Sequence, residues 1–215
     1  MAKEKLKFAF YWAASCGGCE IAVLDINEKI LDVVAKADLV FWPVALDIKY
    51  KDVEAMPDKY IDVCLFNGAI RNSEQEHMAK HLRQKSKVLV AFGSCACDGC
   101  VVGLGNLWNK EKIFERAYLE TPSTKNPQAV TPQTRVQVKE GELELPEFYD
   151  TVKTLAQTVD VDYFISGCPP PVPRVIETFE AILSGKLPPK VSSFLLNKSV
   201  CDECPREKKD RKITQ

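Results

Sequence analysis

Short apolar runs alternate along this chain with segments whose apolar residues recur at helical spacing. Five of the apolar runs are predicted to be β-strands: residues 6–12, 38–43, 62–67, 87–93 and 161–167. Each run is short and bounded by polar or turn-forming residues. This length and these boundaries are typical of strands that are buried on both faces.

Four segments between and after these runs carry the apolar spacing of amphipathic helices: residues 23–33, 73–84, 146–159 and 175–183. Ser73-Glu-Gln-Glu76 reads as a capping box that opens the second of them. Pro146 is predicted to open the third helix, and Gly185 can end the fourth.

The alternation of strands and helices predicts an α/β fold. We expect a flavodoxin-like, doubly wound parallel sheet with helices on both faces, formed by residues 1–196. Residues 100–147, which contain several prolines between 121 and 132, read as a long irregular insertion. Residues 197–215 are predicted to be a short C-terminal tail that carries two cysteines.

Charge and hydropathy exclude several classes of protein. The 215 residues contain 29 Lys and Arg against 30 Asp and Glu, so no nucleic-acid partner is expected. No apolar stretch is long enough to span a bilayer. The apolar residues 6–14 are interrupted by Lys7 and preceded by Glu4, which argues against a signal peptide. We therefore expect a cytoplasmic protein.

Cysteine is abundant, with nine residues, and its placement is more informative than its number. An odd count with C-x-x-C spacing favours metal binding in a reducing compartment over disulfides. Cys16 and Cys19 follow the first predicted strand, Cys95 follows the fourth and Cys168 follows the fifth. Because the carboxyl ends of parallel strands share one edge of a sheet, these four side chains are expected to meet there.

Four thiolates are the ligands that one 4Fe–4S cluster requires. Gly17 and Gly18 allow the backbone to curl close to the sulfurs of Cys16 and Cys19. Two alternatives stay open at this point. The same cysteines could bind a structural zinc ion, or they could be unrelated residues, some of them in the core.

Other polar and sulfur-containing residues are interpreted as structural. His77 and His81 lie four residues apart on a predicted helix, a spacing that can bind zinc. They lack the glutamate of a metalloprotease motif, so we interpret them as a solvated helix surface. Cys64 lies inside a strand and is expected to be buried. Glu20 is expected to cap the following helix, with proton relay as the alternative.

The cysteine motifs carry a resemblance to a known family. Ser15-Cys-Gly-Gly-Cys-Glu20, Gly93-Ser-Cys95 with Gly103-Leu-Gly-Asn106, and Gly167-Cys-Pro-Pro170 resemble the small subunit of NiFe hydrogenases. Residues 13–25, 62–72, 112–124 and 200–208 resemble the cytoplasmic, viologen-reducing type that delivers electrons to heterodisulfide reductase. The two-residue gap between Cys16 and Cys19 favours this branch over the related complex I subunit, whose corresponding cysteines are adjacent.

The resemblance implies a fold, a cofactor and partners. It implies a flavodoxin-like domain in which Cys16, Cys19, Cys95 and Cys168 bind a proximal 4Fe–4S cluster. The NiFe centre would belong to a separate large subunit, so this chain alone would not be catalytic. Electrons would pass toward a small ferredoxin-like or heterodisulfide reductase acceptor, which links the protein to methanogenesis.

The chain departs from the family pattern after Cys95, where the sequence continues to Cys97 and Cys100. Cys100 resembles a supernumerary cysteine of oxygen-tolerant hydrogenases, but the partner cysteine of that arrangement would replace Gly18. A modified cluster is therefore not expected. Three interpretations of Cys97 and Cys100 stay open: small buried residues, ligands of a further metal, or redox-active thiols.

A second departure lies at the C-terminal end. Cys201-Asp-Glu-Cys204 resembles the first half of the family's next cluster site, and the sequence ends at Gln215. We expect residues 197–215 to be the start of a missing or truncated cluster region. Another chain could complete this second site, or the two cysteines could be a remnant. A hydrogenase-derived subunit in a non-hydrogenase redox complex, and a zinc-stabilised interaction module, are the alternative functions.

Overall fold

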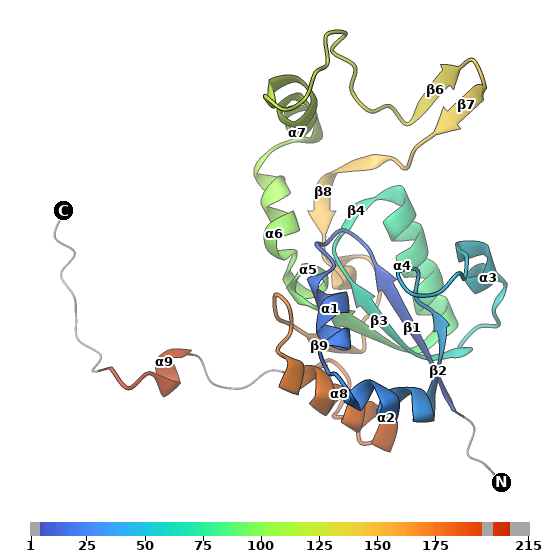
Figure 1. Ribbon diagram of the computed structural model, residues 1–215, viewed down its shortest axis with the longest axis vertical. Coiled ribbons are helices and arrows are strands. Elements are labelled where there is room, and N and C mark those ends of the chain that lie inside the picture. Colours follow the sequence, from blue (N-terminus) through green and yellow to red (C-terminus); the bar gives the residue numbers. More distant parts are fainter. Residues whose placement is uncertain (1–4, 195–199, 207–215) are drawn as a thin grey trace.

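The computed structural model describes residues 5–194 and 200–206, and at its centre lies a six-stranded sheet (Figure 1). Every strand in the sheet is parallel to its neighbours, in the order β10-β9-β5-β3-β1-β2. The strands are β1 (Leu6–Trp12), β2 (Ala37–Phe41), β3 (Ile61–Asn67), β5 (Ser86–Phe92), β9 (Tyr163–Ile165) and β10 (Ser192–Ser193).

All five predicted strands are present in this sheet, within a few residues of their expected bounds. If these five strands are numbered from 1 to 5 along the chain, their order across the sheet is 2-1-3-4-5. This is a common order of doubly wound sheets. The sixth strand, β10, was not predicted, because a pair of serines carries no apolar signal.

Helices cover both faces of the sheet, and the side chains of β1 show why. Phe8 and Phe10 pack on one face with apolar residues of α1 (Gly18–Leu24), α2 (Lys29–Lys36) and α8 (Val172–Ser184). Ala9 and Tyr11 pack on the other face with α3 (Tyr50–Ala55) and α4 (Ser73–Lys85). This alternation buries both faces of the strand and confirms the predicted α/β layers.

Two of the predicted helices differ in detail. The segment predicted as one helix over residues 23–33 is two helices, and Asn27 between them has a φ of 53°. The capping box of α4 is formed by Asn72 and Gln75, one residue before the predicted one. The Asn72 side chain accepts a hydrogen bond from the Gln75 backbone N–H at 2.9 Å.

The prediction of a helix that begins at Pro146 is wrong. Residues of this segment form the strand β8 (Phe148–Lys153), which pairs antiparallel with β4 (Ile70–Asn72). Phe, Tyr, Thr and Val in this strand favour extended backbone, and pairing with β4 outweighs the helical spacing of the apolar residues.

The insertion over residues 100–147 contains regular elements, although none of its residues is buried. A chain of short helical segments follows β5, and in Figure 1 it runs away from the sheet toward a hairpin. After α5 (Ser94–Asp98), which precedes the insertion, these elements are α6 (Cys100–Gly103), η1 (Leu104–Leu107), α7 (Lys110–Phe114), η2 (Glu115–Glu120), β6 (Arg135–Val138) and β7 (Gly141–Glu144). The prediction that this segment is irregular throughout is therefore wrong.

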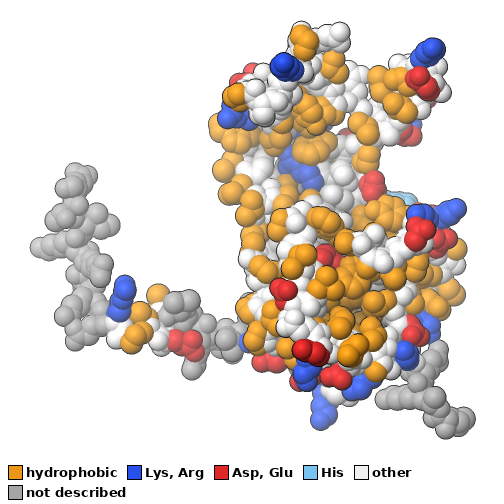
Figure 2. All heavy atoms as spheres, viewed as in Figure 1, with side chains coloured by type: hydrophobic (Ala, Val, Ile, Leu, Met, Phe, Trp, Pro, Cys, Tyr) orange, Lys and Arg blue, Asp and Glu red, His pale blue; other side chains and the backbone are white. Residues whose placement is uncertain are grey.

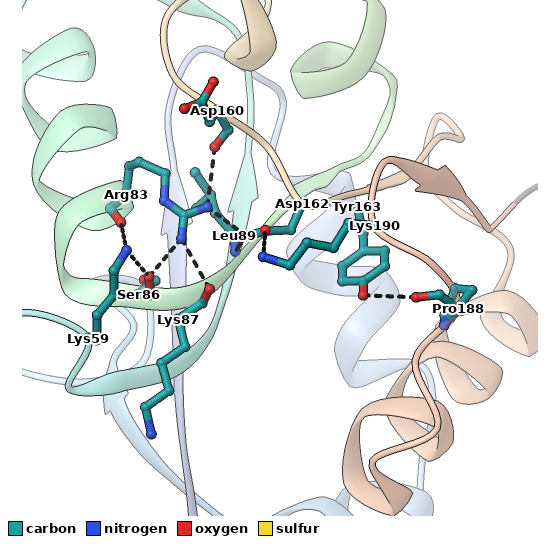
Figure 3. A network of polar contacts seen from close by, with 10 residues as sticks. All are labelled: Lys59, Arg83, Ser86, Lys87, Leu89, Asp160, Asp162, Tyr163, Pro188 and Lys190. Carbon is teal, nitrogen blue, oxygen red and sulfur yellow. Dashed lines mark hydrogen bonds and ion pairs between the residues drawn. The ribbon is translucent and has the colours of Figure 1, made fainter.

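A network of polar contacts ties the sheet together at the amino ends of β5 and β9 (Figure 3). Asp162, just before β9, accepts hydrogen bonds from Arg83 at 2.6 Å and from the backbone N–H of Leu89 at 2.9 Å. Lys190 pairs with the second carboxylate oxygen at 2.7 Å. Burial alone would raise the pKa of Asp162, but these hydrogen bonds outweigh it and lower that pKa.

Within the part of the chain that the structure describes, no helix has both the length and the apolar character needed to cross a bilayer.

Candidate metal centre

The loop after β1 carries Cys16 and Cys19 and is fixed to the turn between β3 and β4. The backbone N–H of Ala14 donates to Ala69 at 3.0 Å, and the Ala69 N–H donates back at 2.9 Å. Cys16 is exposed at the end of this loop, whereas Cys19 is buried in the first turn of α1. The helix begins at Gly18, one residue before Cys19.

Hydrogen bonds join the loops that follow β5 and β9. The backbone N–H of Ser94 donates to the Gly167 carbonyl at 2.8 Å, and the Gly167 N–H donates to the Ser94 hydroxyl at 3.0 Å. The same hydroxyl lies 2.9 Å from that of Ser166, which donates to Asp98 at 3.0 Å. Cys95 and Cys168 directly follow the joined residues, so these contacts hold the two thiols on one side of the sheet.

The thiols of these three loops lie close enough to affect one another. Burial, and then the charges of Cys95 and Cys16, raise the pKa of Cys19 to about 12. Burial, and then the charges of Cys100 and Cys168, raise the pKa of Cys95 to about 11. The structure therefore brings the four predicted cysteines into one group. Because metals bind the thiolate form, a cation must displace these protons when it binds.

A test of fit separates a cluster from a single ion. A zinc ion with bonds of about 2.3 Å to four sulfurs would place those sulfurs about 3.8 Å apart. Within the described chain, no three of the cysteine sulfurs lie within 4.8 Å of one another. The backbone of Gly93 lies directly against the sulfur of Cys19, at a place where a Cβ atom would overlap it. The described cysteines are therefore not spaced as a preformed zinc site, and four thiols from three loops are the donors that one 4Fe–4S cluster requires.

Cys100 lies closer to the four cysteines than the sequence indicated. Its thiol interacts with those of Cys168 and Cys95, and this interaction contributes to raising the pKa of both. The backbone at Cys100 has a φ of 47°, directly after Gly99 with a φ of 84°. This tight turn returns the chain toward Cys95. Its glycine is the signal in the sequence that could have indicated the approach.

The remaining cysteines have different surroundings, although Cys97 is near enough to Cys95 for that thiol to contribute to raising its pKa. Cys97 is half-buried, packs toward the α4 side of the sheet and donates to the Ala91 carbonyl at 3.4 Å. Cys64 is fully buried in β3, as expected. Cys201, on α9 (Val200–Glu203), and Cys204 are exposed, and Figure 1 shows α9 away from the loops that follow β1, β5 and β9.

Glu20 is buried next to Cys19 in the first turn of α1, an arrangement that the sequence did not reveal. One of its carboxylate oxygens accepts a hydrogen bond from the indole N–H of Trp42. Burial raises the pKa of this carboxyl group, and the hydrogen bond opposes that effect. Trp42 follows β2, so the tryptophan after the second strand supports the first turn of α1.

Comparison with known proteins places these features in a family. The family model for the NADH ubiquinone oxidoreductase 20 kDa subunit matches residues 16–182, which include all four cysteines. The iron-sulfur subunit of the F420-non-reducing hydrogenase of Archaeoglobus profundus is 47% identical over 202 residues. That alignment covers 94% of this chain and 63% of the relative.

A second relative is the corresponding F420-non-reducing hydrogenase subunit of Methanothermobacter thermautotrophicus, which is 36% identical over 205 residues. That alignment covers 95% of this chain and 60% of the relative, so the chain spans about three fifths of the length of these relatives. These similarities confirm the predicted resemblance to hydrogenase small subunits.

The fold has a counterpart among solved structures. A chain in the crystal structure of an NAD+-reducing [NiFe]-hydrogenase in the H2-reduced state aligns with a TM-score of 0.73 and 24% identity. The alignment covers 86% of this chain and 94% of that one, and it supports the fold alone. On the family match, which includes the three cysteine-bearing loops, the chain belongs to the NADH ubiquinone oxidoreductase 20 kDa subunit family.

Proposed function

We propose that this protein is the electron-transfer subunit of a cytoplasmic NiFe hydrogenase complex, and that Cys16, Cys19, Cys95 and Cys168 hold one 4Fe–4S cluster. The observation that carries the proposal is the meeting of four thiols from three loops at the carboxyl ends of β1, β5 and β9. The family match and the similarity to a protein named as a hydrogenase iron-sulfur subunit support the same assignment.

When bound, a cluster of this type accepts and donates single electrons. The contribution of the chain is to hold the thiolates in place, limit the access of water and set the local charge. Cys19 and Cys95 are buried, whereas Cys16 and Cys168 are exposed. The site is therefore closed on the side of the sheet and open on the other side, where a partner could complete it.

The exposed side of this region is apolar. On α1, Ile21 and Leu24 are 57% and 55% exposed, and Val101 and Leu104 are 66% and 60% exposed on the segments after Cys100. Figure 2 shows hydrophobic side chains spread over this side of the molecule. Exposed apolar residues in such number are typical of a protein interface. We assign this surface to a large subunit that carries the NiFe centre.

Electrons would leave toward a small ferredoxin-like or heterodisulfide reductase partner. Cys201 and Cys204 would bind a second cluster only with ligands from elsewhere, because they supply two thiolates. The exposed positions of both cysteines are compatible with a shared site of this kind.

Anaerobic purification of the native complex tests the proposal. We expect about four irons and a similar amount of sulfide per chain, with an EPR signal on reduction. Zinc without iron would refute the cluster assignment. A nickel-containing subunit that co-purifies supports the hydrogenase complex, and its absence from an intact complex would favour a non-hydrogenase redox partner.

A further inference from the structure

Both histidines of this chain lie in one place, on a helix that carries none of the cysteines. His77 and His81 are one turn apart on α4 and share a face of that helix. Their ring centroids are 4.2 Å apart. α4 packs on the face of the sheet opposite to α1, which carries Cys19. This site would therefore be separate from the proposed cluster.

A carboxylate from the neighbouring helix completes the group. The Glu54 carboxylate of α3 lies 2.9 Å from Nε2 of His77. Donor atoms of Glu54, His77 and His81 all lie within 4.8 Å of one another. Donors in a tetrahedral zinc site with bonds of about 2.1 Å lie about 3.4 Å apart, so small side-chain rotations would bring all three into coordination distance.

The state of His81 points to a ligand. Its Nδ1 atom is buried, and no residue in the described part of the chain hydrogen-bonds to it. A buried polar atom without a partner is unfavourable. An ion bound to the His81 ring, or a partner brought to this nitrogen when the ion binds, would relieve this cost. Lys80, which lies between the two histidines in the sequence, is held 2.7 Å from Glu76 and so does not neutralise the carboxylate of Glu54.

We propose that Glu54, His77 and His81 form a second metal site, which binds one divalent transition-metal ion of the Zn²⁺ type. Two imidazoles and one carboxylate are a common donor set for such ions and leave a fourth position for water. The partly exposed His77 and Glu54 provide access for the ion. A bound ion would link α3 to α4, and it would add a function to a pair of histidines that the sequence alone suggested were only solvated.

The chain offers a direct test because it contains only two histidines. Zinc is added to the untagged, iron-loaded full chain labelled with 15N-histidine, and the imidazole resonances are followed by NMR. We expect the resonances of both imidazole rings to shift together as zinc is added, and to stop shifting once each histidine site holds one zinc ion. Unused thiols also bind zinc, but they do not contribute to these resonances. The variants His77→Gln and Glu54→Gln should weaken the response of His81 at least tenfold.

Glu111→Gln, which neutralises an exposed carboxylate on α7, is the matched control and should leave the zinc response unchanged. Thermal unfolding gives a second readout. Zinc should raise the melting temperature of the wild type and of the control more than that of Glu54→Gln. Imidazole resonances that do not respond to zinc, or an unchanged zinc affinity in Glu54→Gln, would overturn the proposal. Neither outcome depends on the cysteine site.

Discussion

The backbone of Gly93 lies directly against the sulfur of Cys19, so closely that a single added carbon atom would overlap that sulfur. Gly93 lies between β5 and α5, and Cys19 lies in the first turn of α1. Two parts of the chain more than 70 residues apart are therefore in contact at this point. Gly93 also has a φ of 86°, which disfavours other residues.

Replacing Gly93 with alanine should disrupt the metal centre. The new methyl group would displace the Cys19 sulfur, and the backbone strain should cost about 2 kcal/mol of the free energy of unfolding. We expect a loss of most of the bound iron, measured per chain after anaerobic reconstitution, together with a lower urea midpoint.

Gly103→Ala is the matched control. Gly103 has a φ of −62° and has no atom within 4 Å of the place where a Cβ would stand. Alanine should therefore be tolerated there, with full iron content and unchanged or slightly higher stability. Equal iron contents in the two variants would contradict the close contact at Gly93.

The cysteines near the centre should separate into ligands and neighbours. Cys168→Ser should remove one of the four thiolates and reduce the iron content strongly, whereas Cys97→Ser should leave it unchanged. Cys100→Ser should also keep about four irons per chain, because four other thiolates remain. Since Cys100 lies beside Cys95 and Cys168, its removal should still change the EPR spectrum of the reduced protein.

An iron content in Cys100→Ser that falls as far as in Cys168→Ser would show that Cys100 is a ligand and that the assignment of the fourth thiolate is wrong.

Acid should weaken the network around Asp162. The pKa of Asp162 is lowered in the folded protein. The contribution of Asp162 to stability is therefore complete above about pH 4, which is the usual pKa of an aspartate in an unfolded chain. That contribution is lost as the pH falls through the lowered pKa. Asp162→Asn should therefore lower the free energy of unfolding by about 2 kcal/mol at pH 7, and by progressively less as the pH falls below 4.

Urea unfolding at several pH values measures this difference. Glu144→Gln removes the exposed ion pair with Arg135 on the β6–β7 hairpin and should change stability by less than about 0.5 kcal/mol at any pH. A difference between wild type and Asp162→Asn that is constant down to about pH 2 would contradict the role of ionised Asp162.

Two arginines with little solvent exposure should respond in opposite ways to replacement. Arg71 lies with its guanidinium carbon 4.3 Å from the centre of the Phe148 ring, and no described residue accepts a hydrogen bond from its two terminal nitrogens. Arg83 instead donates to Asp162 and to backbone carbonyls. Arg71→Met should raise the free energy of unfolding by about 1 kcal/mol, whereas Arg83→Met should lower it by about 3 kcal/mol.

Denaturant unfolding of the two methionine variants, which have the same change in charge, decides between these expectations. A large loss of stability in Arg71→Met would show that its guanidinium has a partner, for instance bound water.

The central sheet could be predicted because its strands are buried on both faces and therefore read as continuous apolar runs. The strand β8 could not, since its apolar residues also fit helical spacing and only the pairing with β4 decides the outcome. The hairpin β6–β7 was missed although Arg135–Val138 and Gly141–Glu144 alternate polar and apolar residues, because the prolines and turn-forming residues before them were interpreted as one irregular excursion.

The grouping of Cys16, Cys19, Cys95 and Cys168 was predictable for a similar reason, because parallel strands direct their following loops to the same edge. The approach of Cys100 and the burial of Glu20 against Trp42 depend on turns and on contacts between distant segments. Glu54 joins His77 and His81 only because α3 packs beside α4, which no spacing along the chain reveals.

The hydrogen bonds between Ser94 and Gly167 have a consequence for how the protein matures. Translation produces Cys16 and Cys19 long before the segment that carries Cys168 leaves the ribosome. On the proposed assignment, the early thiols have no complete binding site until β9 has docked beside β5, and they are open until then to oxidation or to capture of a wrong ion. Delivery of iron is therefore expected to follow release of the finished domain, and to depend on factors that act after translation.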